Sequence, residues 1–277
     1  MRVSTPRRAS ERDAKGISIG FRSPTAFGAG KVRAMSRLDE RLARNLGISK
    51  TAVARLLGEA RVTDHEGNVL SDRRMLLPDG DAPTLVHVDG EAMSLYERAL
   101  VLQHKPIGVI TALRDLRHPT AYDLLESAPL FPELRAVGRL DLESSGLLLW
   151  TTEGALIQRL THPKRRVPRT YQVALTQPFA TPTADFALED GYRPEITALT
   201  ALGVDDAHPA LLMSPAAATA PVLASITVVG GAYHEVRRIF VALGSHVLEL
   251  CRTRFGDYEL PGDLPPGEWR ALPLPTT

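Results

Sequence analysis

The chain of 277 residues is 44% hydrophobic and 23% charged, with a formal net charge of +1. This length provides for one large domain or two smaller ones with packed cores, and the balanced charge points to no particular partner. The single cysteine, Cys251, excludes an intramolecular disulfide and a cysteine-rich zinc site. The sequence contains no run of about 18 apolar residues and no signal-peptide segment, so we expect a cytoplasmic protein.

Residues 1–35 are predicted to form a disordered basic arm. They carry eight Lys or Arg residues against two acidic ones, few large apolar side chains and no sustained hydrophobic period. A segment of this composition cannot bury enough apolar surface to fold by itself.

Residues 36–63 predict two short helices with basic outer faces. Leu38, Leu42 and Leu46 share one helical face, Gly47 ends that helix, and Ser49 can cap the next one. Clustered Lys and Arg side chains are typical of a surface that binds phosphates, although solvated basic faces are the alternative. The predicted RNA contacts in this segment are Arg37, Arg41, Arg44, Lys50 and Arg55.

This segment resembles the S4-type RNA-binding domain. The resemblance is carried by Arg37-Leu38-Asp39 and Ser49-Lys50, whereas Ala60-Arg61-Val62 replaces a turn that usually contains glycine. It implies a small helical RNA-binding domain over residues 36–90, which Pro- and Gly-containing positions near residue 80 separate from a second domain over residues 95–277.

The second domain begins with a predicted strand at residues 100–102. Pro106 and Gly108 do not suit a central strand, so residues 105–110 are expected to form a strand–turn–strand edge. A short helix is predicted to start near residue 121, and another over residues 156–160.

The most informative stretch is residues 138–150. Leu147–Trp150 is a run of four apolar residues after Gly146, which is typical of a fully buried strand. The turn before it contains Asp141, a carboxylate that is costly to bury unless it is paired, and Arg139 offers one nearby charge. The alternative is a surface turn in which Asp141 caps its own backbone.

Residues 162–171 predict a basic loop that leads into a strand. The loop has no acidic residue, and Tyr171 follows it; such a loop can bind phosphate and stack a base, whereas a half-buried strand aromatic is the alternative for Tyr171. The predicted RNA contacts here are Lys164, Arg165, Arg166 and Arg169.

Residues 202–250 are predicted to contain a loop, two strands and a helix, and a turn with a final short strand follows at residues 264–270. Residues 202–221, rich in Ala and Pro, are expected to form an extended surface loop. Strands are predicted at residues 224–229 and 247–250, with a helix between them over residues 233–240.

Four stretches resemble the RsuA family of pseudouridine synthases, in the order in which that family has them. They are Lys105-Pro106-x-Gly108, Gly138-Arg139-Leu140-Asp141-x-x-Ser144-Ser145-Gly146, His162-Pro163 leading to Tyr171, and Tyr233-His234-Glu235-Val236-Arg237-Arg238. The resemblance implies an α+β fold, in which a small helical S4-type domain precedes a catalytic domain with a mixed, mostly antiparallel sheet flanked by helices. It also implies isomerisation of uridine to pseudouridine in RNA, with no metal and no other cofactor.

The resemblance assigns roles to individual residues. Asp141 would be the catalytic aspartate, Tyr171 would stack on the uracil, and Arg237 would keep Asp141 ionised, since an arginine within about 4–6 Å lowers the pKa of an aspartate. Arg139 would fill the space left by the flipped nucleotide, and Leu250 would form part of the pocket wall. Lys105 and Arg238 complete the predicted substrate-binding set.

Two departures from the family pattern concern charge. Arg169 stands where many relatives have lysine, which keeps the charge, and Glu235 replaces the usual glutamine. An acid at position 235 is expected to lie near Arg237 and to weaken its pairing with Asp141.

The expected substrate is ribosomal RNA, free or in an assembling ribosomal subunit, and the protein is expected to be a monomer. His118-Pro119-Thr120, followed by a short helix, most resembles the branch that acts on small-subunit 16S RNA; 23S RNA is the second candidate. Two other functions remain open, an RNA-binding protein without catalysis and a glycoside hydrolase that uses Asp141 and Glu143 as its carboxylate pair.

Overall fold

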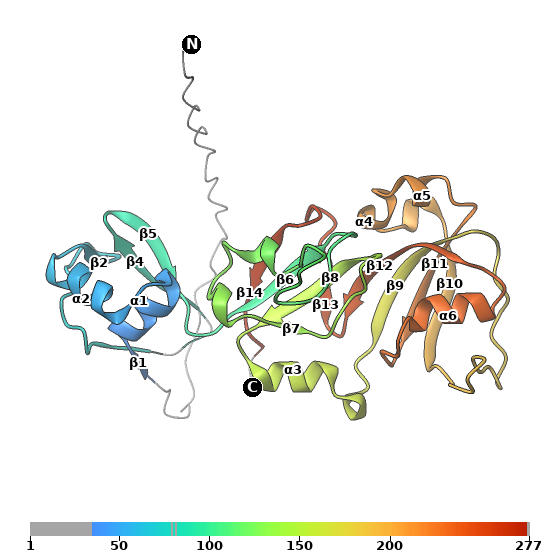
Figure 1. Ribbon diagram of the computed structural model, residues 1–277, viewed down its shortest axis with the longest axis horizontal. Coiled ribbons are helices and arrows are strands. Elements are labelled where there is room, and N and C mark those ends of the chain that lie inside the picture. Colours follow the sequence, from blue (N-terminus) through green and yellow to red (C-terminus); the bar gives the residue numbers. More distant parts are fainter. Residues whose placement is uncertain (1–34, 79, 81, 276–277) are drawn as a thin grey trace, which may run out of the picture. The chain divides into compact units, whose positions relative to one another are not determined.

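The computed structural model describes residues 35–275 except positions 79 and 81 (Figure 1). The predicted basic arm therefore lies outside the described residues, apart from Met35. In the described part of the chain, no helix combines the length and the apolar character needed to cross a membrane.

The first described module is built on two helices and two small sheets, β1-β3 and β2-β4-β5. The predicted helices are confirmed: Ser49 caps the second by accepting a hydrogen bond from the backbone of Ala52, and Gly47 ends the first in the left-handed region. Leu38, Leu42 and Val53 are fully buried in its core. The elements are β1 (Met35–Arg37), α1 (Leu38–Leu46), α2 (Lys50–Gly58), β2 (Val62–Asp64), β3 (Leu76–Pro78), β4 (Thr84–Val88) and β5 (Glu91–Leu95).

A mixed sheet organises the larger region. Within the described residues it has nine strands, with the main order β10-β11-β9-β12-β8-β6-β14; β7 pairs with β8, and β13 with β12. All of these pairs are antiparallel except β8 with β12, which is parallel. The predicted α+β fold with a mixed, mostly antiparallel sheet is thus confirmed. The elements are β6 (Leu100–Lys105), β7 (Arg135–Val137), β8 (Ser144–Thr151), α3 (Gly154–Thr161), β9 (Arg169–Leu175), β10 (Ile196–Leu202), α4 (Pro209–Leu212), α5 (Pro215–Ala218), β11 (Val222–Val228), α6 (Glu235–Ala242), β12 (Val247–Phe255), β13 (Tyr258–Glu259) and β14 (Trp269–Leu272).

Strand β8 is buried on both faces. Leu147 and Leu149 pack into one hydrophobic cluster, whereas Leu148 and Trp150 pack into another on the opposite face. A strand covered on both sides has no polar face, which explains why its sequence is continuously apolar instead of alternating. The predicted buried strand is confirmed, and it fixes the polar turn before it against the centre of the sheet.

The expected surface loop at residues 202–221 is wrong. The segment ends β10 and then forms α4 and α5, which bury Leu211 and Ala217 against the sheet. Each of these short helices begins with proline at its first position, and the side chains of His208 and Ser214 accept a hydrogen bond from the first-turn backbone. The prediction of a loop rested on composition, and alanine and proline are common in loops as well as at the starts of short helices.

Candidate active site

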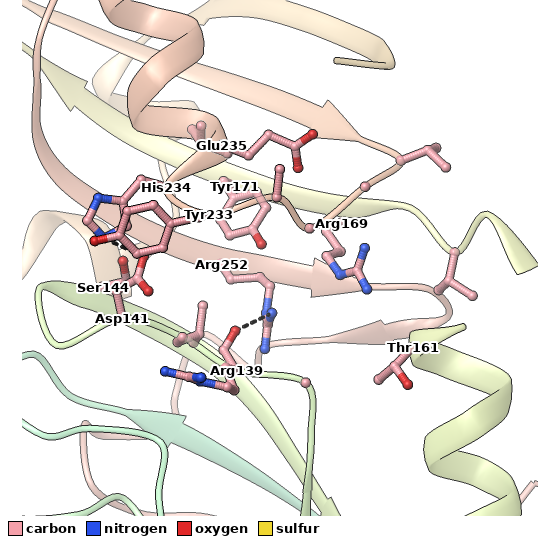
Figure 2. A pocket seen from close by; sticks show the side chains of 18 of the residues that line it. Arg139, Asp141, Ser144, Thr161, Arg169, Tyr171, Tyr233, His234, Glu235 and Arg252 are labelled. Atoms are coloured by element: carbon pink, nitrogen blue, oxygen red, sulfur yellow. Dashed lines mark hydrogen bonds and ion pairs between the residues drawn. The ribbon is translucent and has the colours of Figure 1, made fainter. Parts of the chain in front are cut away.

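A pocket of about 800 Å³ lies between the turn before β8, the start of β9, the middle of β12 and the loop before α6 (Figure 2). Its volume is in the range of sites that take a small-molecule ligand. The pocket brings together seven of the predicted site residues: Arg139, Asp141, Arg166, Arg169, Tyr171, Arg237 and Leu250.

The strand register explains how distant residues reach this pocket. Tyr171 on β9 lies directly opposite Arg252 on β12, and Val173 lies opposite Leu250. Directly opposed residues of an antiparallel pair point to the same face, and residues two apart on a strand do so as well. Tyr171, Leu250 and Arg252 therefore face the pocket together.

Gly146 permits the close approach of β8 to β12. It pairs with Arg252 and has a φ of +106°, and a Cβ added to it would lie 2.3 Å from the backbone oxygen of Arg252. No other residue type fits this position without moving a strand. Gly146 thus fixes the distance between the Asp141 turn and the strand that carries Arg252.

The turn that carries Asp141 is held at its backbone by side chains from the end of β6 and from the segment after it. The Lys105 ammonium donates hydrogen bonds to the backbone oxygens of Pro106, Asp141 and Ser144, at 2.9, 3.0 and 2.7 Å. The Thr111 hydroxyl donates to the backbone oxygen of Leu140 and accepts from its N–H. These contacts position the carboxylate without touching it.

The prediction that Lys105 binds substrate is wrong. Its side chain is fully buried beneath the turn, and the three carbonyl oxygens that it contacts belong to the protein. The Lys105-Pro106-x-Gly108 stretch instead supports the site from below, since Gly108 also donates to the backbone oxygen of Leu142 at 2.9 Å. Sequence shows a lysine near the site but not which way its ammonium points.

Burial lowers the pKa of Lys105 from 10.5 to about 8, although the Asp141 carboxylate acts in the opposite direction. Between these two values the folded protein loses this proton while the unfolded chain keeps it, so stability rises with pH. Relative to Lys105→Met, the wild-type protein should gain up to about 3 kcal/mol in free energy of unfolding between pH 8 and pH 10.5. Urea titrations at pH 7, 8, 9 and 10 measure this difference, and parallel pH profiles for the two proteins would contradict it.

The side chain of His234 lies beside the Asp141 carboxylate. The Oδ2 of Asp141 lies 3.7 Å from Nε2 of His234, and the Asp141 side chain is 40% exposed. His234 has a φ of +48°, an uncommon backbone conformation, and the Tyr233 ring stacks on its ring at 3.9 Å between centroids (Figure 2).

Arg237, the predicted partner of Asp141, is engaged elsewhere. It donates to the backbone oxygens of Glu143 and Val247, at 3.0 and 3.2 Å, and its guanidinium is 3.8 Å from the Glu143 carboxylate. The predicted pairing is therefore not the one that the structure shows. Arg237 lines the pocket and ties the Asp141 turn to β12, which is a positioning contact.

Glu235, expected to lie near Arg237 and to weaken its pairing with Asp141, bonds another residue. It is buried, and its carboxylate accepts a hydrogen bond from the Tyr192 hydroxyl at 2.7 Å. Burial, together with this hydrogen bond, raises the pKa of Tyr192 to about 12. Arg238, predicted to bind substrate, is paired with Asp190 and is not among the residues that line the pocket.

The predicted RNA contacts differ in burial and in their partners within the chain. Arg41 is fully buried, and its guanidinium bonds Ser36 and Glu97, so the prediction that it contacts RNA is wrong. Of the others, Arg37, Arg44, Lys50 and Arg166 form ion pairs with acidic residues of the chain. Arg55, Lys164 and Arg165 are exposed, and Arg169 is partly buried at the pocket. The roles of all except Arg41 stay predictions.

Sequence reasoning missed Arg252 and His234. Arg252 lies near the middle of a strand, where nothing in the sequence distinguishes it from an exposed arginine such as Arg254. The signal for His234 was its place beside Tyr233 in a recognised motif, but its backbone conformation is set by the loop. The described residues include no cluster of three or more His, Cys, Asp or Glu side chains that could hold a metal ion.

Comparisons with known proteins agree on one group. A family model described as RNA pseudouridylate synthase matches residues 99–242. Ribosomal small subunit pseudouridine synthase A of Yersinia pestis is 34% identical over 239 residues, covering 85% of this chain and 94% of that protein. Its Escherichia coli K12 counterpart is also 34% identical, covering 85% and 96%. A crystal structure of a pseudouridylate synthase matches with a TM-score of 0.50 and 26% identity, covering 85% of this chain and 95% of that one.

Proposed function

The chain belongs to the RNA pseudouridylate synthase family, and from this membership we propose that it converts one uridine of small-subunit ribosomal RNA to pseudouridine. The proposal of this target rests on relatives named ribosomal small subunit pseudouridine synthase A, to which 85% of the chain aligns. Because ribosomal RNA is the substrate, we propose that the protein works in the cytoplasm.

One observation carries the residue assignment: a half-exposed carboxylate, Asp141, and an aromatic ring, Tyr171, line one pocket that is rich in arginine. Five arginines and two acids are among the lining residues. In the reaction the bond between uracil N1 and ribose C1′ breaks, the base turns, and C5 bonds to C1′. C5 then loses its proton and N1 takes one up, so the product is an isomer of uridine. The residue assigned to this reaction is Asp141, acting at the ribose or as a base.

The target uridine must leave its stack to reach Asp141. Flipping a nucleotide costs a few kcal/mol, and stacking on one aromatic ring returns about 1–3 kcal/mol. Phosphate contacts supply the rest, so binding should weaken steeply as salt concentration rises. We propose that residues 36–90 act as an S4-type RNA-binding domain and, with the exposed Arg55, Lys164 and Arg165, provide such contacts.

Stacking by Tyr171 predicts separate effects for two substitutions. Tyr171→Ala removes the ring and should lower kcat/KM by at least about tenfold, the equivalent of one lost base–aromatic stack. Tyr171→Phe keeps the ring and should leave RNA affinity within about twofold of wild type. Filter binding and single-turnover kinetics measure the two quantities; equal loss of affinity in both variants would contradict a stacking role.

The test of function is to map pseudouridine on ribosomal RNA after incubation with the protein. Carbodiimide treatment followed by reverse transcription is suitable, because uridine and pseudouridine have the same mass. A new stop in 16S RNA is expected; a stop in 23S RNA would move the target to the large subunit. Binding without any stop, on free RNA and on ribosomal particles, would leave an RNA-binding protein without catalysis.

The glycoside hydrolase alternative is not retained. Family membership argues against it, and the Glu143 carboxylate is 79% exposed and turned toward Arg237. It does not line the pocket beside Asp141.

A further inference from the structure

The Arg252 guanidinium has a donor with no partner in the structure. The residue is 1% exposed; Nε donates to the backbone oxygen of Leu147 at 2.8 Å, and Nη1 to that of Arg139 at 3.5 Å. Nη2 has no hydrogen-bond partner, and only the Ser144 hydroxyl shares this property among the buried side-chain atoms of the described residues. A charged donor left unpaired at such burial is costly, so a partner from outside the chain is expected.

A second arginine lies beside it. The guanidinium carbons of Arg169 and Arg252 are 4.8 and 5.0 Å from the centre of the same Phe255 ring, and both residues line the pocket (Figure 2). Burial lowers the pKa of Arg169, and the charge of Arg252 lowers it further. Two neighbouring cations that destabilise one another need an anion between them.

The nearby acid does not fill that role. The negative charge of Glu235 raises the pKa of Arg169, but its carboxylate accepts a hydrogen bond from the Tyr192 hydroxyl and not from Arg169. Its Oε1 also lies 2.6 Å from where a Cβ on Gly230 would stand, so the loop before α6 packs directly on it. The arginine pair, Arg169 and Arg252, thus has charge left for a ligand.

We propose that the arginine pair binds a phosphodiester group next to the target uridine. This inference rests on the proposed function and deepens it. Tyr171 lies opposite Arg252 in the sheet, so the phosphate of a nucleotide stacked on Tyr171 falls within reach of the pair. Guanidinium forks match phosphate oxygens in geometry and charge, whereas a neutral uracil carbonyl would compensate neither cation. The phosphate anchors the flipped nucleotide in the pocket.

The test combines a change in the RNA with a change in the protein. Short RNAs that contain the target uridine carry an uncharged methylphosphonate at its 5′ or its 3′ phosphate. With wild-type protein, one of these replacements should lower kcat/KM by about tenfold to a hundredfold, the range for a lost charge-assisted hydrogen bond. Arg169→Gln should show a similar loss on unmodified RNA and no further loss on that methylphosphonate RNA, because the two changes remove the same contact.

Arg169 is the residue to replace because Arg252 also ties β12 to β8 through Leu147. Arg254→Gln is the matched control. Arg254 is on β12, like Arg252, but its side chain is 50% exposed and paired with Glu259. The Arg254→Gln variant should lose as much kcat/KM on the methylphosphonate RNA as the wild-type protein does.

The same four combinations, wild type and Arg169→Gln on unmodified and methylphosphonate RNA, form a double-mutant cycle that is also measured as RNA affinity. Affinity does not depend on turnover. If neither methylphosphonate weakens binding by wild-type protein, or if Arg169→Gln keeps the full sensitivity, the inference is overturned. Failure of the proposed function gives a different result, no pseudouridine on unmodified RNA, while the affinity cycle still reports on the arginine pair.

Discussion

Asp141→Asn should lower pseudouridine formation by at least about 10³-fold while RNA affinity stays within about twofold of wild type. Asparagine fills the same space but can neither attack the ribose nor accept a proton, and losing such a group costs a factor in this range. The carboxylate is 40% exposed, and the turn is held through backbone atoms, so the free energy of unfolding should change by less than about 1 kcal/mol. Carbodiimide mapping and filter binding measure the two effects.

Glu143→Gln is the control for this variant. Glu143 lies two residues later in the same turn, and its side chain is 79% exposed. Activity should stay within about fivefold of wild type, since the backbone oxygen of Glu143, which Arg237 contacts, is unchanged. If Asp141→Asn formed pseudouridine at the wild-type rate, Asp141 would not be the catalytic carboxylate.

Gly146→Ala should lower the free energy of unfolding by at least about 3 kcal/mol. The added Cβ would stand 2.3 Å from the oxygen and 2.6 Å from the nitrogen of Arg252, which are backbone atoms that a side-chain rotation cannot move. The φ of +106° adds strain for any residue with a Cβ. Urea denaturation measures the loss, and RNA affinity should fall as β12 moves away.

Gly154→Ala provides the comparison. Gly154 is the first residue of α3, has no positive φ, and has no atom within 4 Å of its added Cβ. Substitution there should be neutral or stabilise by up to about 1 kcal/mol, because alanine restricts the unfolded chain. Equal effects of the two substitutions would show that β8 and β12 separate freely.

The parts of the fold that were predictable are those that local chemistry determines. Leu147–Trp150 is buried on both faces and reads as one apolar run, and Ser49 and Gly47 mark helix ends whatever packs around them. The short helices α4 and α5 were missed, because four-residue helices are stabilised by packing on the sheet more than by their own sequence.

The sequence predicted which residues line the site, but not which partners their side chains contact. Asp141, Tyr171 and Arg139 line the pocket, as their motifs indicated. The direction of long basic side chains depends on which backbone oxygens and carboxylates the fold brings close. For this reason Lys105 and Arg41, both expected at the RNA surface, are instead buried among internal partners.

The support of the Asp141 turn has a consequence for how the sequence can vary. Lys105, Gly108 and Thr111 bind the turn only through carbonyl and amide groups, which every residue type except proline supplies alike. The conformation of the turn therefore depends on residues about thirty positions earlier in the chain. It depends little on the side chains at positions 142 and 143. Drift at those two positions, or their randomisation in a library, should leave the aspartate in place, whereas the upstream segment tolerates far less.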